Sequence, residues 1–186
     1  MEELLGVFIG IGLSATCGFR VFVPLLGMSL AHHAGALSFT NGFDWIGSWP
    51  ATIAFSLAMI IEIAGYYIPW LDNLLDTIAT PAAIVAGTIA TASMVGDVSP
   101  FLRWTLAIIA GGGIAGLVQG SSVLVRGAST AHTAGLANPV VSTGELAASI
   151  LGTLISIIFP IVSFILVVLL LTFILRKFLR SHPSSG

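Results

Sequence analysis

The feature that most constrains the fold is a long apolar run near the C-terminus, residues 145–178, in which Pro160 is the main break. As one straight helix it would be roughly 50 Å long, whereas a bilayer core is about 30 Å thick. We therefore expect two short helices, or a kinked pair, that meet at Phe159-Pro160. The whole chain has the same character, since 56% of its 186 residues are hydrophobic and only 8% are charged. This composition lies outside the range of soluble domains and predicts an all-α bundle of transmembrane helices.

The remaining composition argues against several classes of protein. The net charge is −2 and the only basic stretch is 176–180, so we expect no nucleic-acid partner. The single cysteine, Cys17, allows no internal disulfide. Neither H-E-x-x-H nor G-x-S-x-G occurs, and we predict that the protein is not an enzyme. The histidines lack the ligand count of a zinc site, so neither a metal nor a cofactor is expected.

Helix start and stop signals divide the chain into about six membrane segments, with five as the alternative. Ser or Thr before a Pro is typical of a helix N-terminus. Such signals occur at Ser48/Pro50, Thr80-Pro81 and Ser99-Pro100. The segments are expected at about 3–31, 50–68, 80–96 and 99–125, with two more within 145–178. The N-terminus, Met-Glu-Glu, has the wrong charge for a signal peptide, so we expect the first helix to be retained.

Shorter elements fill the spaces between these segments. Pro69 ends the second segment, and residues 69–80 place leucines on one face and polar residues on the other. This pattern predicts an amphipathic helix in the membrane interface. Residues 32–49 and 126–144 are predicted to be polar connections, and Ser142-x-x-Glu145 is interpreted as a capping box that begins the fifth helix.

An internal duplication is also indicated. Residues 12–35 and 112–135 are identical at nine of 24 positions, and six of these fall between Gly27 and Gly35. Three predicted helices separate the copies, and an odd number places the second copy in the opposite orientation. We therefore predict two inverted halves, 1–97 and 98–180, each built around a Pro-interrupted helix, with a polar tail at 181–186. Inverted repeats with broken helices are common among transporters.

Two charges interrupt the predicted membrane helices. Arg20 and Glu62 both lie roughly 17 Å from the same end of the first helical hairpin, counting 1.5 Å per residue. Because a buried charge is tolerated mainly when it is paired, we predict an Arg20–Glu62 ion pair. Pro24 displaces the helical hydrogen bond to the carbonyl of Arg20, so a charge and a freed carbonyl coincide. The pair is interpreted either as a substrate or gating site or as a bridge that only fixes helix packing.

Other polar residues form weaker candidate sites. Asp72 and Asp76 share a helix face where two carboxylates can bind a cation, although a water-facing surface explains them as well. Asn138, Ser142 and Glu145 form a candidate polar site in the second half, and Glu145 is within reach of Arg126. Three prolines are predicted helix breaks: Pro24, Pro69 and Pro160. A stripe of small residues is a candidate homodimer surface: Gly112, Gly116 and Gly120.

Several motifs together resemble a known family. They are G-F-R-V-F-V-P from Gly18, E-x-x-x-x-x-I-P-W-L-D-N-L-L-D-T from Glu62, P-A-A from Pro81, and N-P-V-V-S-T-G-E from Asn138. The chain resembles the bacterial and plastid membrane family catalogued as domain of unknown function 4126. The family often has a basic residue in the fourth helix and an acidic residue after the last Glu, where this chain has 119–121 and Leu146. The resemblance implies a bacterial inner-membrane protein or a plastid relative and brings no activity.

Two functions are therefore expected as alternatives. The first is passage of a small solute, ion or lipid along a polar path at the repeat interface, lined by Arg20 and Glu62. The second is a membrane scaffold or assembly factor that transports nothing and whose buried charges only stabilise the bundle. In either case the lipid bilayer is the main partner. The basic stretch 176–180 predicts a cytoplasmic C-terminus in a multi-pass protein of the bacterial inner (plasma) membrane.

Overall fold

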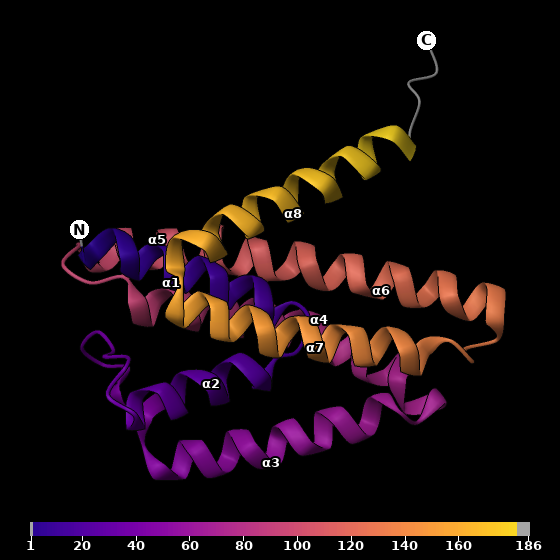
Figure 1. Cartoon of the computed structure of the whole chain (residues 1–186), viewed down its shortest axis with the longest axis horizontal. Helices are drawn as coiled ribbons and strands as arrows, with labels where there is room; N and C mark the ends of the chain where they lie inside the picture. Colours follow the sequence, from indigo (N-terminus) through magenta and orange to yellow (C-terminus); the bar gives the residue numbers. More distant parts are fainter. Residues whose placement is uncertain (1, 182–186) are drawn as a thin grey trace.

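The structure is a computed structural model that describes residues 2–181, without the side chains of residues 2, 69, 70, 72, 73 and 178–181. Every element in this range is helical (Figure 1). In chain order they are α1 (Glu2–Cys17), α2 (Phe22–His33), η1 (Asp44–Gly47), α3 (Trp49–Tyr66), α4 (Pro69–Met94), α5 (Pro100–Leu106), η2 (Ala107–Gly112), α6 (Gly113–Thr133), α7 (Asn138–Ile158) and α8 (Pro160–Ser181).

The first predicted membrane segment is two helices that form a hairpin inside the bundle. α1 runs antiparallel to α4, with Gly6 against the backbone of Met94 and the Ser14 hydroxyl donating to the carbonyl of Gly87 at 2.7 Å. The chain then turns at residues 18–21, and α2 returns toward the end of the bundle at which α1 began (Figure 1). The prediction of one crossing helix over 3–31 is therefore wrong.

Contacts of α2 with α3 fix this return. The start of α2 lies beside Glu62, whereas its end lies beside Thr52, which contacts the Ser29 hydroxyl at 2.7 Å and His33 Nε2 at 3.0 Å. The break has a local cause, because Pro24 cannot donate a helical hydrogen bond and its ring excludes a helical carbonyl at Arg20. Pro24 sits in the first turn of α2, where proline is tolerated, so the predicted helix break at this proline is confirmed.

The following pair, α3 and α4, confirms one prediction and corrects another. Ser48 caps α3 by accepting from the amide of Ala51, and the helix ends just before Pro69, as predicted. α4, however, is one helix from Pro69 to Met94 that continues through Pro81. The predicted interfacial helix and separate third segment are wrong, because α4 continues through Thr80-Pro81 without a break and Asp76 is buried against Arg126.

The second half consists of long helices. Residues 100–133 are helical without a gap, because α5 passes through a single π-helical stretch, η2, into α6. The Ser99 cap predicted for this helix is confirmed, since its hydroxyl accepts from the amide of Leu102. The loop after α6 is only 134–137, where Ala134 takes the left-handed conformation (φ 52°) that ends the helix. Residues predicted to be a polar connection therefore lie on α6 and α7.

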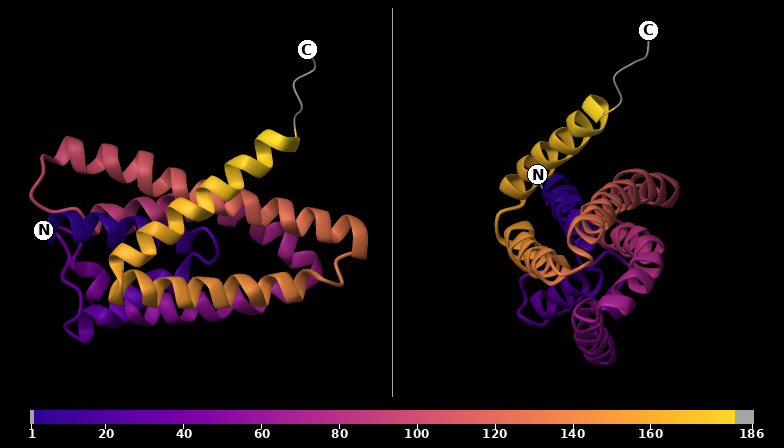
Figure 2. Two further views of the ribbon diagram at one scale, coloured as in Figure 1. Left: turned by 45° about the horizontal axis from the view of Figure 1, so that its top comes forward. Right: turned by 90° about the vertical axis from the view of Figure 1, so that its right-hand side faces the viewer.

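Two further predictions for this half can be compared with the structure. α7 begins at Asn138, so Ser142 and Glu145 lie inside the helix and the predicted capping box is wrong. The predicted break at Phe159-Pro160 is confirmed, and α7 and α8 are separate helices. α8 packs across α1 and α7 and then projects from the bundle (Figure 2).

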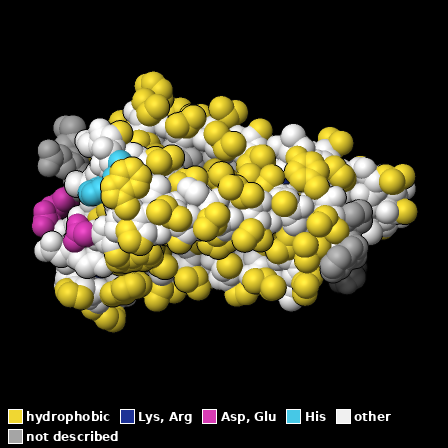
Figure 3. All heavy atoms as spheres, turned by 90° about the horizontal axis from the view of Figure 1, so that it is seen from below, with side chains coloured by type: hydrophobic (Ala, Val, Ile, Leu, Met, Phe, Trp, Pro, Cys, Tyr) yellow, Lys and Arg dark blue, Asp and Glu magenta, His cyan; other side chains and the backbone are white. Residues whose placement is uncertain are grey.

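Five helical stretches of the described chain are long and apolar enough to cross a membrane. They are Trp49–Tyr66, Leu74–Met94, Pro100–Thr133, Asn138–Ile158 and Pro160–Lys177. Apolar side chains cover the visible surface, and acidic and histidine side chains gather at one end (Figure 3). The chain therefore has the all-α transmembrane fold that the sequence predicts, with five helices that are able to span a membrane, where six segments or five were expected, and with the shorter α1–α2 hairpin packed against them.

The predicted inversion of two halves is not confirmed. Along α1, Gly6 packs against Met94 and Gly10 against Thr91, whereas along η2 and α6 Gly111 packs against Thr91 and Gly116 against Ile84. Both helices are therefore antiparallel to α4 and run in the same direction as each other. The two similar stretches also differ locally, since 12–35 contains the break and 112–135 has none. The predicted inversion requires the first segment to cross the membrane once, whereas the α1–α2 hairpin returns to the end of the bundle at which α1 began.

The glycine stripe of the fourth predicted segment is used within the chain. Gly112 packs against Thr88 and Ile84 of α4, and Gly116 also packs against Ile84. Glycines at such positions let two helix backbones approach closely. Gly120 has no contact of this kind. The stripe therefore joins α6 to α4 and does not support the predicted homodimer.

Candidate functional site

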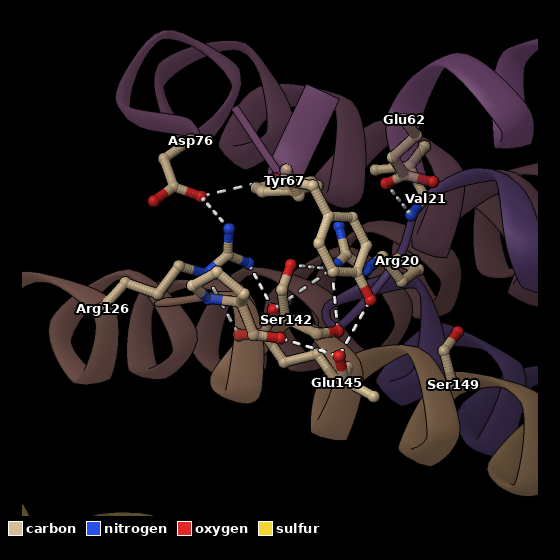
Figure 4. A network of polar contacts seen from close by, with 12 residues as sticks. Arg20, Val21, Glu62, Tyr67, Asp76, Arg126, Ser142, Glu145 and Ser149 are labelled. Carbon is tan, nitrogen blue, oxygen red and sulfur yellow. Dashed lines mark hydrogen bonds and ion pairs between the residues drawn. The ribbon is translucent and has the colours of Figure 1, made fainter. Parts of the chain in front are cut away.

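Five charged side chains meet inside the bundle, and we call them the buried charge cluster (Figure 4). Each comes from a different element: Arg20 from the α1–α2 turn, Glu62 from α3, Asp76 from α4, Arg126 from α6 and Glu145 from α7. All five residues are at most 9% exposed. The four that lie on helices fall within membrane-spanning stretches, and Arg20 lies at the turn that these helices enclose.

Arg126 is the centre of the cluster. Its Nη1 lies 3.0 Å from Asp76 Oδ1. Its Nε donates to Glu145 Oε1 at 3.3 Å, and its Nη2 donates to Glu145 Oε2. This two-point contact is the strong form of an arginine–carboxylate pair. The contact of Glu145 with Arg126 that the sequence suggested is confirmed, although Arg126 lies on a helix and not in a loop.

Tyr66 joins the two arginines. The central guanidinium carbons of Arg20 and Arg126 each lie 4.0 Å from the centroid of its ring. The ring face attracts both cations, and this attraction is stronger away from water. The Tyr66 hydroxyl also donates to Asp76 Oδ1 at 3.3 Å. A single aromatic side chain at the end of α3 therefore positions both guanidinium groups.

Arg20 is held on one side only. Its Nη2 donates to the backbone carbonyl of Ser142 at 2.9 Å and to the Ser142 hydroxyl. The same nitrogen lies 3.8 Å from Glu145 Oε2. Nε and Nη1 of Arg20 are buried and make no hydrogen bond within the described structure. Since a buried donor without an acceptor is costly, this arginine retains capacity for another ligand.

Glu62 does not form the predicted ion pair with Arg20. Its Oε1 accepts from the amide of Val21 at 2.8 Å, and its Oε2 accepts from the amide of Phe22 at 3.2 Å. The two residues do lie at the same depth, as the counting predicted, but the partner of the carboxylate is the N-terminus of α2. The predicted pairing is wrong because residues 18–21 form a turn and not continuous helix, and the turn leaves amide groups free for the carboxylate.

The cluster contains unequal numbers of opposite charges. Three carboxylates, on Glu62, Asp76 and Glu145, face two guanidinium groups, on Arg20 and Arg126. Isolated charges are expensive inside a membrane and usually mark a functional site. If every group is ionised, the cluster carries one net negative charge. A proton or a cation is the simplest way to balance it.

A polar stripe continues from the cluster along α7. All the buried residues of this helix are polar, namely Asn138, Ser142, Glu145, Ser149, Thr153 and Ser156. Ser149 donates to the carbonyl of Thr16 at 3.2 Å, and Ser156 contacts Ser163 of α8 at 2.8 Å. A helix that faces protein with hydroxyl groups and faces lipid with apolar groups gives a polar line through the bundle.

The structure brings together some of the predicted site residues and separates others. Asn138, where α7 begins, donates to the Thr130 hydroxyl at 3.0 Å and lies on the same helix face as Ser142 and Glu145. Asp76 is buried against Arg126, so it does not form a water-facing pair, and the side chain of Asp72 lies outside the described part. Pro69 and Pro160 are the first residues of α4 and α8.

Two residues of the site are not among the site residues predicted from the sequence. The sequence places Arg126 in a loop, within reach of Glu145, and assigns no role to Tyr66. A usable signal existed for Arg126, because it follows Gln119 by seven residues and Ala115 by eleven, which is the spacing of one helix face. No comparable signal marked Tyr66, since a lone tyrosine near a helix end is typical of the membrane interface.

The fold and the cluster together define the class of this protein, a polytopic α-helical membrane protein with a charged site inside the bundle. The chain matches the model of the family described as "Domain of unknown function (DUF4126)" over residues 7–180. It therefore belongs to this family, as its motifs indicated. No curated protein and no solved structure gives a significant match.

Proposed function

We propose that the protein moves a small polar or charged solute across the membrane through the buried charge cluster. The observation that carries this proposal is the position of the cluster at the tip of the α1–α2 hairpin, at membrane depth. Broken helices that meet charged side chains near the midplane form the solute sites of many transporters. Charged side chains that only join helices can do so from continuous helices, whereas Arg20 lies at the break between α1 and α2.

The polar stripe on α7 supplies the rest of the route. On one side of the cluster, Ser149, Thr153 and Ser156 lead along α7 toward Phe159. On the other side, Asn138 lies at the start of α7, directly after the 134–137 turn. Hydroxyl and amide groups can exchange hydrogen bonds with a passing polar solute in place of water. This continuity supports passage rather than a closed binding pocket.

A scaffold remains the second candidate, and one observation favours it. Arg126 pairs with Asp76 and Glu145 and thereby joins α4, α6 and α7. Removal of one member of such a network leaves a buried charge without compensation and is strongly destabilising, so a purely structural role would explain why these charges are present. The two functions differ in the role of Arg20, whose Nε and Nη1 make no hydrogen bond within the described structure. Transport requires this arginine to contact the solute, whereas a scaffold requires it only to hold helices together.

Solute flux through reconstituted protein tests the proposal. Proteoliposomes are challenged in a stopped-flow light-scattering assay with small neutral solutes and monovalent salts. We expect faster volume recovery than in empty liposomes for at least one solute. In Arg20→Ala this excess rate falls at least about tenfold, which corresponds to about 1.4 kcal/mol at the barrier. Arg176→Ala, an exposed arginine on α8, is the matched control and keeps the wild-type rate.

Unfolding of the same variants separates the two candidates. Arg20→Ala leaves Glu145 paired with Arg126, so a transport site predicts lost flux with a smaller loss of thermal stability than in Arg126→Ala. No flux for any solute, together with a collapsed fold in Arg20→Ala, contradicts transport and favours the scaffold. We further propose the bacterial inner membrane as location and a cytoplasmic C-terminus, because Arg176 and Lys177 are exposed near the end of α8.

A further inference from the structure

The N-terminus of α2 opens inside the bundle, at membrane depth. α2 has twelve residues and begins at Phe22, and no side chain of its own N-cap, Val21, satisfies its first amides. The N-terminus of a helix carries a partial positive charge and free N–H donors, which together bind anions. In a membrane interior such donors need an acceptor from the protein or from a ligand.

Glu62 now fills this position as an anion from the same chain. Its two carboxylate oxygens accept separately from Val21 and Phe22, at 2.8 and 3.2 Å. Glu62 belongs to α3, and these two hydrogen bonds are the contacts that its carboxylate makes with the start of α2. A free carboxylate could make the same two contacts.

Arg20 provides an independent sign of a ligand. It directly precedes Val21 and is 1% exposed, and its Nε and Nη1 have no acceptor in the described structure. Figure 4 shows Arg20, Val21 and Glu62 side by side. The Glu62 carboxylate accepts from the two amides and does not bond to these guanidinium N–H groups. A small anion that is not attached to α3 can shift toward Arg20 and use both kinds of donor, which is how arginine recognises a carboxylate.

Space for Glu62 to leave this position is also present. A groove of about 240 Å³ lies between α2, α3 and α4, and Val21, Phe22, Glu62 and Tyr66 line it together with apolar side chains. A charged carboxylate would be costly in such apolar surroundings, whereas a protonated carboxyl group is far less so. Departure of Glu62 into the groove therefore requires a proton.

We infer that the α2 N-terminus and Arg20 form a site for a small monoanion of carboxylate type, and that Glu62 occupies this site until the monoanion displaces it. This inference rests on the proposed function, whose solute it specifies. One proton from the aqueous phase binds Glu62 as its carboxylate leaves the amides, and the incoming anion replaces the carboxylate charge. One anion and one proton are then bound together, and their passage is electroneutral.

Other charged and titratable groups surround Glu62 and set the conditions for this exchange. They come from each element near it: Cys17 of α1, Arg20 of the turn, Tyr66 of α3, Asp76 of α4, Arg126 of α6 and Glu145 of α7. Asp76 and Glu145 each have a contact with Arg126, whereas Glu62 has backbone donors only. Glu62 is therefore the carboxylate that can leave without breaking an ion pair.

Proton uptake on anion binding tests the inference. Formate is added to purified wild-type protein in weakly buffered detergent solution, with chloride and phosphate as comparison anions, and proton uptake and binding heat are recorded. We expect about one proton taken up for each formate bound, and an affinity that falls about tenfold for each unit of pH rise. Glu62→Gln binds formate without proton uptake and without this pH dependence. Glu3→Gln, an exposed glutamate, behaves as wild type.

Three outcomes overturn the inference. Wild-type protein that binds none of the three anions has no anion site, even where the flux assay shows passage of another solute. Formate binding without proton uptake in wild type means that Glu62 is not displaced. Equal pH dependence in wild type and Glu62→Gln assigns the proton to another group. If Glu62→Gln does not fold, the wild-type measurement alone tests the inference: about one proton taken up per formate supports it, and no proton uptake overturns it.

Discussion

The two buried arginines of the cluster have different surroundings, and this difference determines what each does. Arg126 contacts Asp76 through Nη1 and Glu145 through both Nη2 and Nε, so its charge is compensated where it lies. Arg20 has hydroxyl and carbonyl acceptors from Ser142 and only a distant carboxylate at 3.8 Å. Removing one member of a buried ion pair costs more than the pair contributes, because the other charge remains without compensation.

The first prediction therefore concerns Arg126. Arg126→Ala removes the guanidinium contact of Asp76 and leaves Glu145 only Arg20 at 3.8 Å, and we expect a loss of about 3–5 kcal/mol in the free energy of unfolding. The measurement is SDS titration of purified protein in mixed micelles, followed by circular dichroism. Adding Glu145→Gln to Arg126→Ala should recover part of the loss, since one uncompensated charge is removed.

Arg176→Ala serves as the matched control for this prediction. Arg176 is exposed near the end of α8, and surface substitutions usually change stability by no more than about 0.5 kcal/mol. An Arg126→Ala variant as stable as Arg176→Ala would show that Asp76 and Glu145 are not charged partners of Arg126 in the folded protein.

At the scale of the helices, the turn between α1 and α2 is the element that creates the site. It exposes the amides that Glu62 accepts from and directs Arg20 into the bundle. Gly18 begins the turn and lies directly against α6, where an added Cβ would stand 2.6 Å from the carbonyl oxygen of Ala115 and from Val118 Cβ. No larger residue fits there unless α1 and α6 move apart.

The second prediction follows from this packing. Gly18→Ala should destabilise the protein by about 1–3 kcal/mol, the usual cost of overpacking a tight interior. Gly120→Ala, on α6 with open space around it, should change stability little or raise it by up to about 1 kcal/mol, because alanine favours helix. Thermal unfolding in detergent measures both variants. If Gly18→Ala is as stable as Gly120→Ala, the close contact of α1 with α6 does not exist in solution.

Helix boundaries can be predicted where a signal next to the boundary sets them. The prediction fails where contacts between residues far apart in the sequence set them. The starts at Ser48, Ser99 and Pro160 depend on caps and prolines next to the boundary, and all three were correct. The sequence pattern predicts a water-facing surface for 69–80 and a loop for 126–144. Asp76, Arg126 and Glu145 are buried instead because they compensate one another's charges, and one sequence gives no distance between such residues.

At the scale of the whole molecule, charge is distributed unequally between the two ends. The exposed acidic residues Glu3, Asp44 and Asp97 lie at the end where α1 begins, together with the histidines visible in Figure 3. Lys177 lies close to Ala128 of α6, toward the opposite end. Basic residues favour the cytoplasmic side, so the acidic end is expected outside.

The last prediction concerns the sidedness of the N-terminus, which separates the two possible segment counts. With six crossings, the N-terminus and the 134–137 turn would share one side of the membrane. With the α1–α2 hairpin and five crossings, the N-terminus instead shares a side with the loops 34–48 and 95–99 (Figure 1). The two arrangements therefore differ in the side on which Glu3 lies. Each of the three loops lies on the same side in one arrangement as in the other.

Single cysteines decide between these arrangements. Cys17 is replaced by Ser, and Glu3→Cys, Ser38→Cys, Asp97→Cys and Leu136→Cys are introduced one at a time at exposed positions. Intact cells are treated with a membrane-impermeant thiol reagent. We expect labelling at 3, 38 and 97 and none at 136 until the cells are opened. Labelling at 38 and 97 without labelling at 3 would mean that the first segment crosses the membrane, and the site at the tip of the hairpin would then lose its structural basis.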